Sequence, residues 1–87
     1  MKFYYNYIIE SLKDGSLYKG CTDDLARRVK DHNDGLVEST KNKRPWRLIY
    51  YEACLDKKDA YDREKYLKSG WGRKFIQERL KNYLKKK

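Results

Sequence analysis

The chain of 87 residues has little of several residue types that would mark a particular class of protein. It contains one proline, one methionine, one histidine and two cysteines, and no apolar run near the roughly 20 residues that cross a bilayer. The first residues, MKFYYNYIIE, lack the apolar stretch and cleavage site of a signal peptide. Cys21 and Cys54 have no CxxC spacing, which favours reduced thiols over a redox or zinc motif. These absences predict a cytoplasmic protein without a membrane segment.

Charge, by contrast, is abundant and unevenly placed. The formal net charge is +9. Residues 41–47 (KNKRPWR) contain four bases and no acid, and residues 62–87 contain ten bases against three acids. Two basic segments in so small a chain favour a polyanionic partner, most simply nucleic acid. The alternative is a basic surface that only keeps the protein soluble.

The length predicts one domain with a single modest core, most simply between two packed layers. Aromatic and β-branched residues predict strands at 2–10, 16–21 and 46–54, with a hairpin turn at Asp14-Gly15 between the first two. Residues 38–45 are expected to form a loop. Because the chain opens with a hairpin, the sheet should be small, three-stranded and antiparallel.

Helices are expected between and after the strands. The first begins at a Thr22 or Asp23 cap and runs to about residue 33. The second runs from an Asp56 cap to about residue 68, and after a break at SGWG a last helix runs from about residue 73 to 84. The order β-β-α-β-α-α predicts an α+β fold, in which helices flank the antiparallel sheet.

Four polar side chains of the first half are expected to converge. Arg28 and His32 are four residues apart and share a helical face with apolar residues, so both lean toward the core. Tyr7 and Tyr18 lie on the two arms of the hairpin, within reach of one another. Two phenols, a guanidinium and an imidazole suit phosphodiester chemistry, because a phenol can relay a proton of water and an arginine stabilises charge on phosphate.

Glu64 is the only acid on the predicted apolar stripe of its helix, which also carries Ala60 and Leu67. A buried carboxylate without a partner is unfavourable, so it should have an arginine partner, a raised pKa or a metal. An ordinary ion pair, or a helix rotated enough to expose Glu64, is the alternative.

These residues resemble the GIY-YIG nuclease family, specifically the small stand-alone type related to the N-terminal domain of the excinuclease UvrC. The segments that carry the resemblance span about residues 4 to 84 and are YNYII, LYKG, DLARRVKDHNDG, RPWRLIYYE and AYDREKYLK. Three positions depart from the family pattern. Asn6 replaces an apolar residue, Lys19 replaces isoleucine or valine, and Cys21 stands where many members have a lysine or a small residue.

The resemblance implies a metal-dependent endonuclease that hydrolyses phosphodiester bonds. Glu64 would bind Mg²⁺ or Mn²⁺ and Arg28 would hold the scissile phosphate. Either Tyr7 or Tyr18, with or without His32, would activate the attacking water. The nuclease domain would occupy residues 1–84, followed by a basic tail at 85–87.

The resemblance also implies a nucleic-acid partner, with DNA favoured over RNA and a role in repair or recombination. The bases expected to bind it are Lys19, Arg27, Lys41, Lys43, Arg44, Arg73 and Lys74. Trp46 and Trp71 could stack on bases, although core packing is the stronger expectation for both. The alternative function is a non-catalytic DNA- or RNA-binding module, or a subunit of a larger repair complex. The oligomeric state is left open.

Overall fold

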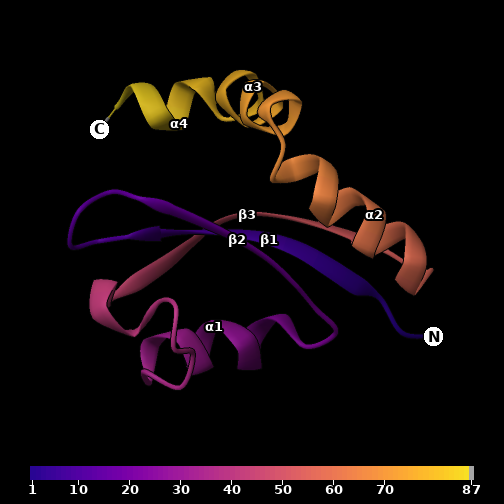
Figure 1. Cartoon of the computed structure of the whole chain (residues 1–87), viewed down its shortest axis with the longest axis horizontal. Coiled ribbons are helices and arrows are strands. Elements are labelled where there is room, and N and C mark those ends of the chain that lie inside the picture. Colours follow the sequence, from indigo (N-terminus) through magenta and orange to yellow (C-terminus); the bar gives the residue numbers. More distant parts are fainter. Residues whose placement is uncertain (87) are drawn as a thin grey trace.

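The centre of the fold is a three-stranded antiparallel sheet with strand order β2-β1-β3. In the computed structural model, which describes residues 1–86, the strands are β1 (Tyr4–Ser11), β2 (Leu17–Thr22) and β3 (Trp46–Cys54). Helix α1 (Leu25–Asn33) lies on one face of the sheet, and a 3₁₀ helix, η1 (Lys41–Lys43), follows it. The helices on the other face are α2 (Lys57–Leu67), α3 (Gly70–Arg79) and α4 (Lys81–Lys85) (Figure 1). The predicted α+β class, sheet and element order are confirmed.

The central strand β1 is covered on both faces, and this gives the molecule two cores. Six consecutive residues, from Asn6 to Ser11, are buried, because a strand between two helical layers has no solvent face. On the α1 side the core contains Tyr7, Ile9 and Trp46. On the α2 and α3 side it contains Ile8, Leu67 and Ile76. The expectation of one core between two layers is therefore wrong, and the fold has three layers.

The local signals in the sequence placed most element boundaries. Gly15 adopts a φ of 80° at the hairpin turn, where glycine carries no steric penalty. Asp56 caps α2 as predicted, with its side chain accepting hydrogen bonds from two backbone N–H groups. For α1 the cap is Asp24, whose carboxylate accepts from the backbone N–H of Arg27, and the prediction of Thr22 or Asp23 is wrong.

The predicted break after residue 68 is present, because α2 ends at Leu67, but α3 begins at Gly70 rather than near residue 73. Ser69 caps the helix, and its hydroxyl accepts from the backbone N–H of Gly72. Gly72 is buried against the end of α2, where an added Cβ would lie 2.2 Å from the carbonyl oxygen of Tyr66. Gly72 therefore serves close helix packing rather than a turn. The helix predicted over 73–84 divides at Leu80, and α4 ends at Lys85. Of the predicted tail, Lys87 lies outside the described residues.

We predict that Gly72→Ala lowers the free energy of unfolding by about 2–3 kcal/mol, because its Cβ meets backbone atoms that cannot move aside easily. Gly70→Ala is the matched control in the same helix, since its Cβ would approach only the Arg73 guanidinium, at 3.9 Å. Gly70→Ala should change stability by less than about 1 kcal/mol. Urea denaturation of the three proteins measures both effects, and equal losses would contradict the packing argument.

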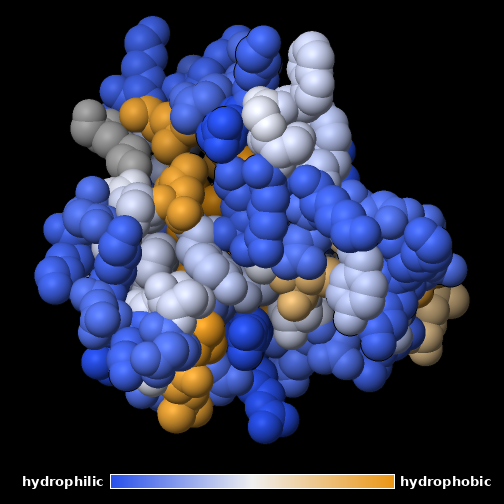
Figure 2. Space-filling model, in the orientation of Figure 1, coloured by the Kyte–Doolittle hydropathy of each residue, from blue (hydrophilic) through white to orange (hydrophobic). Residues whose placement is uncertain are grey.

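The surface is mostly hydrophilic, with small apolar patches between charged side chains (Figure 2). Within residues 1–86, no helix has the length and apolar character needed to span a bilayer. The two tryptophans differ sharply, because Trp46 is 5% exposed and Trp71 is 69% exposed. The core expectation is confirmed for Trp46 and is wrong for Trp71.

Candidate active site

The Tyr7 side chain lies across β2, the edge strand of the sheet, at Gly20. Tyr7 and Gly20 are partners in the β1–β2 register, and a Cβ added to Gly20 would lie 2.4 Å from the Tyr7 hydroxyl oxygen. Any larger residue at position 20 would therefore displace the phenol. Tyr18 packs in the same cluster, so the predicted proximity of the two tyrosines is confirmed.

His32 lies fully buried beneath this phenol. Its Nε2 is 2.7 Å from the Tyr7 hydroxyl, and its Nδ1 is 2.7 Å from the Thr40 hydroxyl. Thr40 in turn donates to the carbonyl oxygen of Val37, at 3.4 Å. We therefore assign the proton of the neutral imidazole to Nδ1, which donates to Thr40. Nε2 is then the acceptor for the O–H of Tyr7.

Burial sets the protonation states of this pair. Burial, with a smaller contribution from the positive charge of Arg28, lowers the pKa of His32 to about 4. Burial also raises the pKa of Tyr7 to about 12, against the opposing hydrogen bond and charge of Arg28. At neutral pH the site therefore contains a protonated phenol and a neutral imidazole. Tyr7 can act on a water proton only by passing its own proton to His32.

We predict that His32 makes stability fall as the pH is lowered. The unfolded chain protonates this histidine near pH 6.5, whereas the folded protein does so near 4. The unfolded state therefore binds more protons between these values, and the stabilisation present above pH 6.5 is lost progressively below it. At about pH 4.5 the loss from this residue is about 2.5 kcal/mol.

Urea denaturation at about pH 7 and pH 4.5 measures this effect, with His32→Gln as the non-titrating comparison. The native protein should lose about 2 kcal/mol more than the variant between the two pH values. An equal loss in both proteins would show that His32 is not held neutral by burial.

Arg28 is half-buried and remains reachable from solvent. It lines two surface hollows of about 490 and 330 Å³, the second of which also contains Cys21 and Lys57. Its effect on the pKa of Tyr7 places the guanidinium beside the phenol. Arg27, its neighbour, is exposed. A phosphate that enters the second hollow would meet the Arg28 guanidinium and Lys57, whereas Tyr7 is 1% exposed and lines neither hollow.

Glu64 reaches the same region from the opposite layer. Burial raises the pKa of the Cys21 thiol, and the Glu64 charge raises it further. The same carboxylate also contributes to the raised pKa of Tyr7. The charge of Glu64 therefore acts on both residues, although α2 and α1 cover different faces of the sheet. The two layers approach one another at the β2 edge, where Arg28 of α1 and Lys57 of α2 line one hollow with Cys21.

Asn6 of β1 forms a hydrogen bond to α2 at Ala60, one helical turn before Glu64. Its side-chain amide donates to the carbonyl oxygen of Ala60, at 3.1 Å, and both residues are buried. A hydrophobic residue, which the GIY-YIG pattern has at this position, cannot make this bond. The Asn6 Oδ1 atom is buried and has no hydrogen-bond partner among the described residues.

The set of side chains fits one divalent cation at Glu64. No group of three or more His, Cys, Asp or Glu side chains within residues 1–86 could hold a metal ion. A single carboxylate is nevertheless a normal protein ligand for Mg²⁺, which keeps most of its waters. The Glu64 side chain is 25% exposed, and the Lys68 ammonium lies 3.2 Å from its Oε2. A divalent cation at this carboxylate would therefore have to displace the Lys68 ammonium.

Six of the seven predicted nucleic-acid-binding residues fall into two groups, and Arg27 lies apart from them on α1. Lys19 lies on the α2 and α3 side, where burial, and then the charges of Arg73 and Lys68, lower its pKa. Lys74 lies over the ring of Trp71, at 5.0 Å. Lys19, Arg73 and Lys74 thus lie on the side of the sheet that α2 and α3 cover, and Glu64 is on α2.

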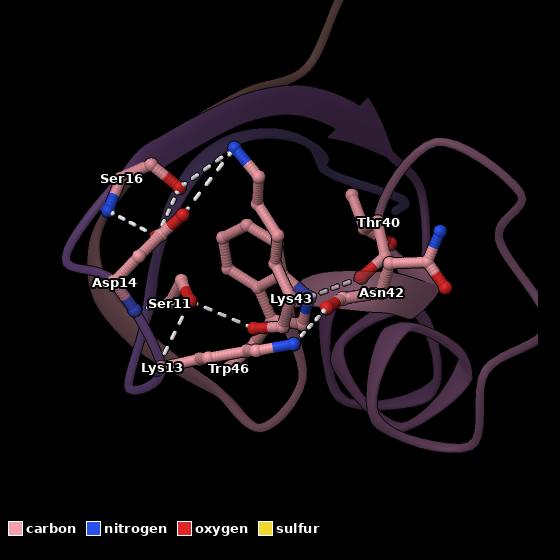
Figure 3. A network of polar contacts seen from close by, with 8 residues as sticks. All are labelled: Ser11, Lys13, Asp14, Ser16, Thr40, Asn42, Lys43 and Trp46. Carbon is pink, nitrogen blue, oxygen red and sulfur yellow. Dashed lines mark hydrogen bonds and ion pairs between the residues drawn. The ribbon is translucent and has the colours of Figure 1, made fainter.

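The bases of segment 41–44 hold a loop in place. Lys43 pairs with Asp14 of the hairpin turn, at 3.5 Å, and its backbone carbonyl accepts from Ser11 (Figure 3). Lys41 pairs with Glu38, and the Arg44 Nε donates to the carbonyl oxygen of Lys41. Part of the charge of this segment is thus neutralised within the fold.

Two residues of the site carried no recognisable signal in the sequence. Thr40, which orients His32, sits in the segment that was predicted only as a loop. Asn33 ties the same loop to α1, because its amide exchanges two hydrogen bonds with the backbone of Trp46. The Trp46 indole N–H completes the link by donating to the Thr40 carbonyl oxygen, at 2.9 Å (Figure 3).

The fold and this arrangement define a small nuclease-type domain, and sequence comparison supports that class. The GIY-YIG catalytic domain family matches residues 3–82, so the chain belongs to the GIY-YIG family. A UPF0213 protein of Clostridium perfringens is 42% identical over 65 residues, which cover 74% of this chain and 69% of that protein. The UPF0213 protein YazA of Bacillus subtilis is 43% identical over 63 residues, which cover 71% of this chain and 64% of YazA.

A solved structure of another UPF0213 protein is also similar to this chain. The solution NMR structure of a UPF0213 protein from Bacillus halodurans matches with a TM-score of 0.52 and 35% identity. The match covers 85% of this chain and 81% of that one. The family implies interaction with nucleic acid, and its nucleases generally use divalent metals.

Proposed function

We propose that this protein is a metal-dependent endonuclease that hydrolyses phosphodiester bonds, with DNA as the favoured substrate. The observation that carries the proposal is that Arg28 and Glu64, from two different layers, both act on the Tyr7 phenol. A protein that only binds nucleic acid has no use for a carboxylate there, because the carboxylate repels phosphate unless a cation intervenes.

Arg28 binds the scissile phosphate in the proposed reaction. The guanidinium lines open hollows, and it can stabilise the negative charge that grows on the phosphate as water attacks. Its neighbour Tyr7 orients that water. Arg28 thus places the phosphate next to the only buried phenol–imidazole pair among residues 1–86.

Tyr7 and His32 handle the proton of the attacking water. The Tyr7 oxygen receives it while the phenol O–H passes its own proton to His32 Nε2, over 2.7 Å. The low pKa of His32 makes the imidazolium short-lived, which favours its return to neutral after each turnover. Tyr18 packs against the His32 ring, with centroids 5.1 Å apart, and completes the wall of the site. We assign the proton transfer to Tyr7 because its hydroxyl bonds to His32.

Glu64 would hold the divalent cation, Mg²⁺ or Mn²⁺. When bound there, the cation would contribute charge neutralisation at the phosphate and the departing oxygen. Lys68 would give up its ion pair with Glu64 and become free to bind a neighbouring phosphate. The exposed Arg27 would contribute phosphate contacts beside Arg28.

The wider proposal is a cytoplasmic enzyme of DNA repair or recombination, alone or within a larger complex. Its two cysteines are both unpaired, as suits a reducing compartment. Residues 1–84 form the nuclease domain in this view. The final basic residues add to nucleic-acid binding.

A nuclease assay tests the proposal. Labelled single-stranded, duplex, nicked and branched DNA, and matching RNA, are incubated with the protein in Mg²⁺, Mn²⁺ or EDTA. We expect cutting that needs the metal and is strongest on DNA. Tight and salt-sensitive binding without cutting on any substrate would instead favour a binding module. Cutting that persists in EDTA would overturn the assigned role of Glu64.

A further inference from the structure

Trp71 is a rigid aromatic surface without a role in the core. At 69% exposure it is the most exposed aromatic side chain among residues 1–86. Its neighbour Gly72 is locked against the backbone of α2, which fixes the direction in which the indole projects. Trp71 borders two hollows of about 850 and 370 Å³ on α3. A planar group can therefore approach the indole.

The surroundings of Trp71 are basic. Arg73 and Lys74 line the larger hollow with it, and the Lys74 ammonium lies 5.0 Å from the ring centre. The acid in the lining, Glu78, is ion-paired with Lys81 at 3.3 Å. An exposed indole framed by cations is complementary to a nucleic-acid strand, in which flat bases alternate with phosphates.

Cations also connect this surface to the candidate active site. Lys68 pairs with Glu64, and Lys19 on the edge strand lies close enough to Lys68 and Arg73 for both charges to lower its pKa. Trp71 follows Lys68 by three residues, so their Cα atoms are at most about 11 Å apart. A few nucleotides of a single strand can span that separation.

We propose that Trp71 stacks on an unpaired base of the substrate strand. The backbone of that strand would run along Arg73, Lys19 and Lys68 to the cleavage site. The inference rests on the proposed function for the direction of this path. Within a duplex the faces of the bases are already covered by their neighbours, so the platform selects substrates with an unpaired segment, such as a single strand, an overhang or a flap.

Binding without cleavage tests the proposal. The probes are a labelled single strand of about 12 nucleotides, as DNA and as RNA, and a blunt duplex of the same sequence. All proteins carry Glu64→Gln and are kept in EDTA, so that nothing is cut. Adding Trp71→Ala should weaken single-strand binding about tenfold and duplex binding less than about twofold. Trp71→Phe should keep most of the affinity, because a smaller aromatic ring remains.

Controls separate stacking from a general loss of fold or charge. Tyr51→Ala removes another exposed aromatic, from the far edge strand β3, and should leave binding unchanged. Intrinsic fluorescence should be quenched by the single strand, and the quenching should vanish in Trp71→Phe because Trp46 is buried. Equal losses on single strand and duplex would overturn the proposal. Unchanged binding in Trp71→Ala, or no binding of any probe, would overturn it too.

The binding experiment and the nuclease assay can fail independently of one another. A protein that needs Trp71 for single strands but never cuts would retain this inference and refute the nuclease. A protein that cuts with metal but binds single strands equally well without Trp71 would do the reverse.

Discussion

Glu64→Gln should abolish metal-dependent cleavage, lowering kcat by about a thousandfold or more. The substitution keeps the size of the side chain and removes the negative charge that would hold the cation. Because Glu64 is the acid whose charge reaches both Tyr7 and Cys21, we expect no other described carboxylate to take over its role. Single-turnover cleavage across a series of Mg²⁺ and Mn²⁺ concentrations measures the loss.

Asp62→Asn is the matched control for Glu64→Gln. Asp62 lies on the same helix and pairs with a lysine one turn away, Lys58, at 3.2 Å, as Glu64 pairs with Lys68. Its substitution removes the same charge and frees an equivalent lysine, yet it should change kcat less than about twofold. Comparable losses in the two variants would mean that the net charge of α2, rather than a metal at Glu64, supports cleavage.

Arg28→Ala should lower kcat/KM by about a hundredfold or more, because it removes the group that meets the phosphate beside Tyr7. Arg28→Lys should recover little, since an ammonium cannot reproduce the paired hydrogen bonds of a guanidinium. The measurement is steady-state cleavage of the best substrate from the nuclease assay. Circular dichroism confirms that each variant is folded.

Arg27→Ala supplies the comparison, since Arg27 has the same charge, precedes Arg28 on α1 and is exposed. It should weaken nucleic-acid binding a few-fold, with kcat nearly unchanged. The slope of log affinity against log salt should fall by about one unit, as expected for a single phosphate contact. If the two arginines gave the same kinetic pattern, neither would be placed at the scissile phosphate.

Sequence patterns predicted the features that depend on nearby residues. The strand at 46–54, the Asp56 cap and the shared helical face of Arg28 and His32 all follow from local periodicity or capping chemistry. The proximity of Tyr7 and Tyr18 follows from the turn at Gly15, which sets a register that pairs Tyr7 with Gly20 and Tyr18 with Ile9. These local signals were enough to predict which elements carry most residues of the candidate site.

The errors came from contacts between distant segments. Gly72 was interpreted as a helix breaker, because only the approach of α2 shows why a glycine is needed inside α3. Trp71 was expected in the core because the sequence does not show that Gly72 packs against α2. With Gly72 packed there, the neighbouring Trp71 side chain points to solvent. Thr40 could not be identified, because its importance comes from its bond to His32.

The placement of β1 between two cores has a consequence for how the molecule opens. Tyr7 and Ile9 belong to one core and Ile8 to the other, so both layers must detach before the strand loses its cover. Amide protons of β1 should therefore exchange with solvent only through global unfolding. Those of α4, which buries no residue, should exchange through local fraying. The strand that carries Tyr7 should thus have the slowest-exchanging backbone among the described residues, which would place the proposed proton relay on the most stable part of the fold.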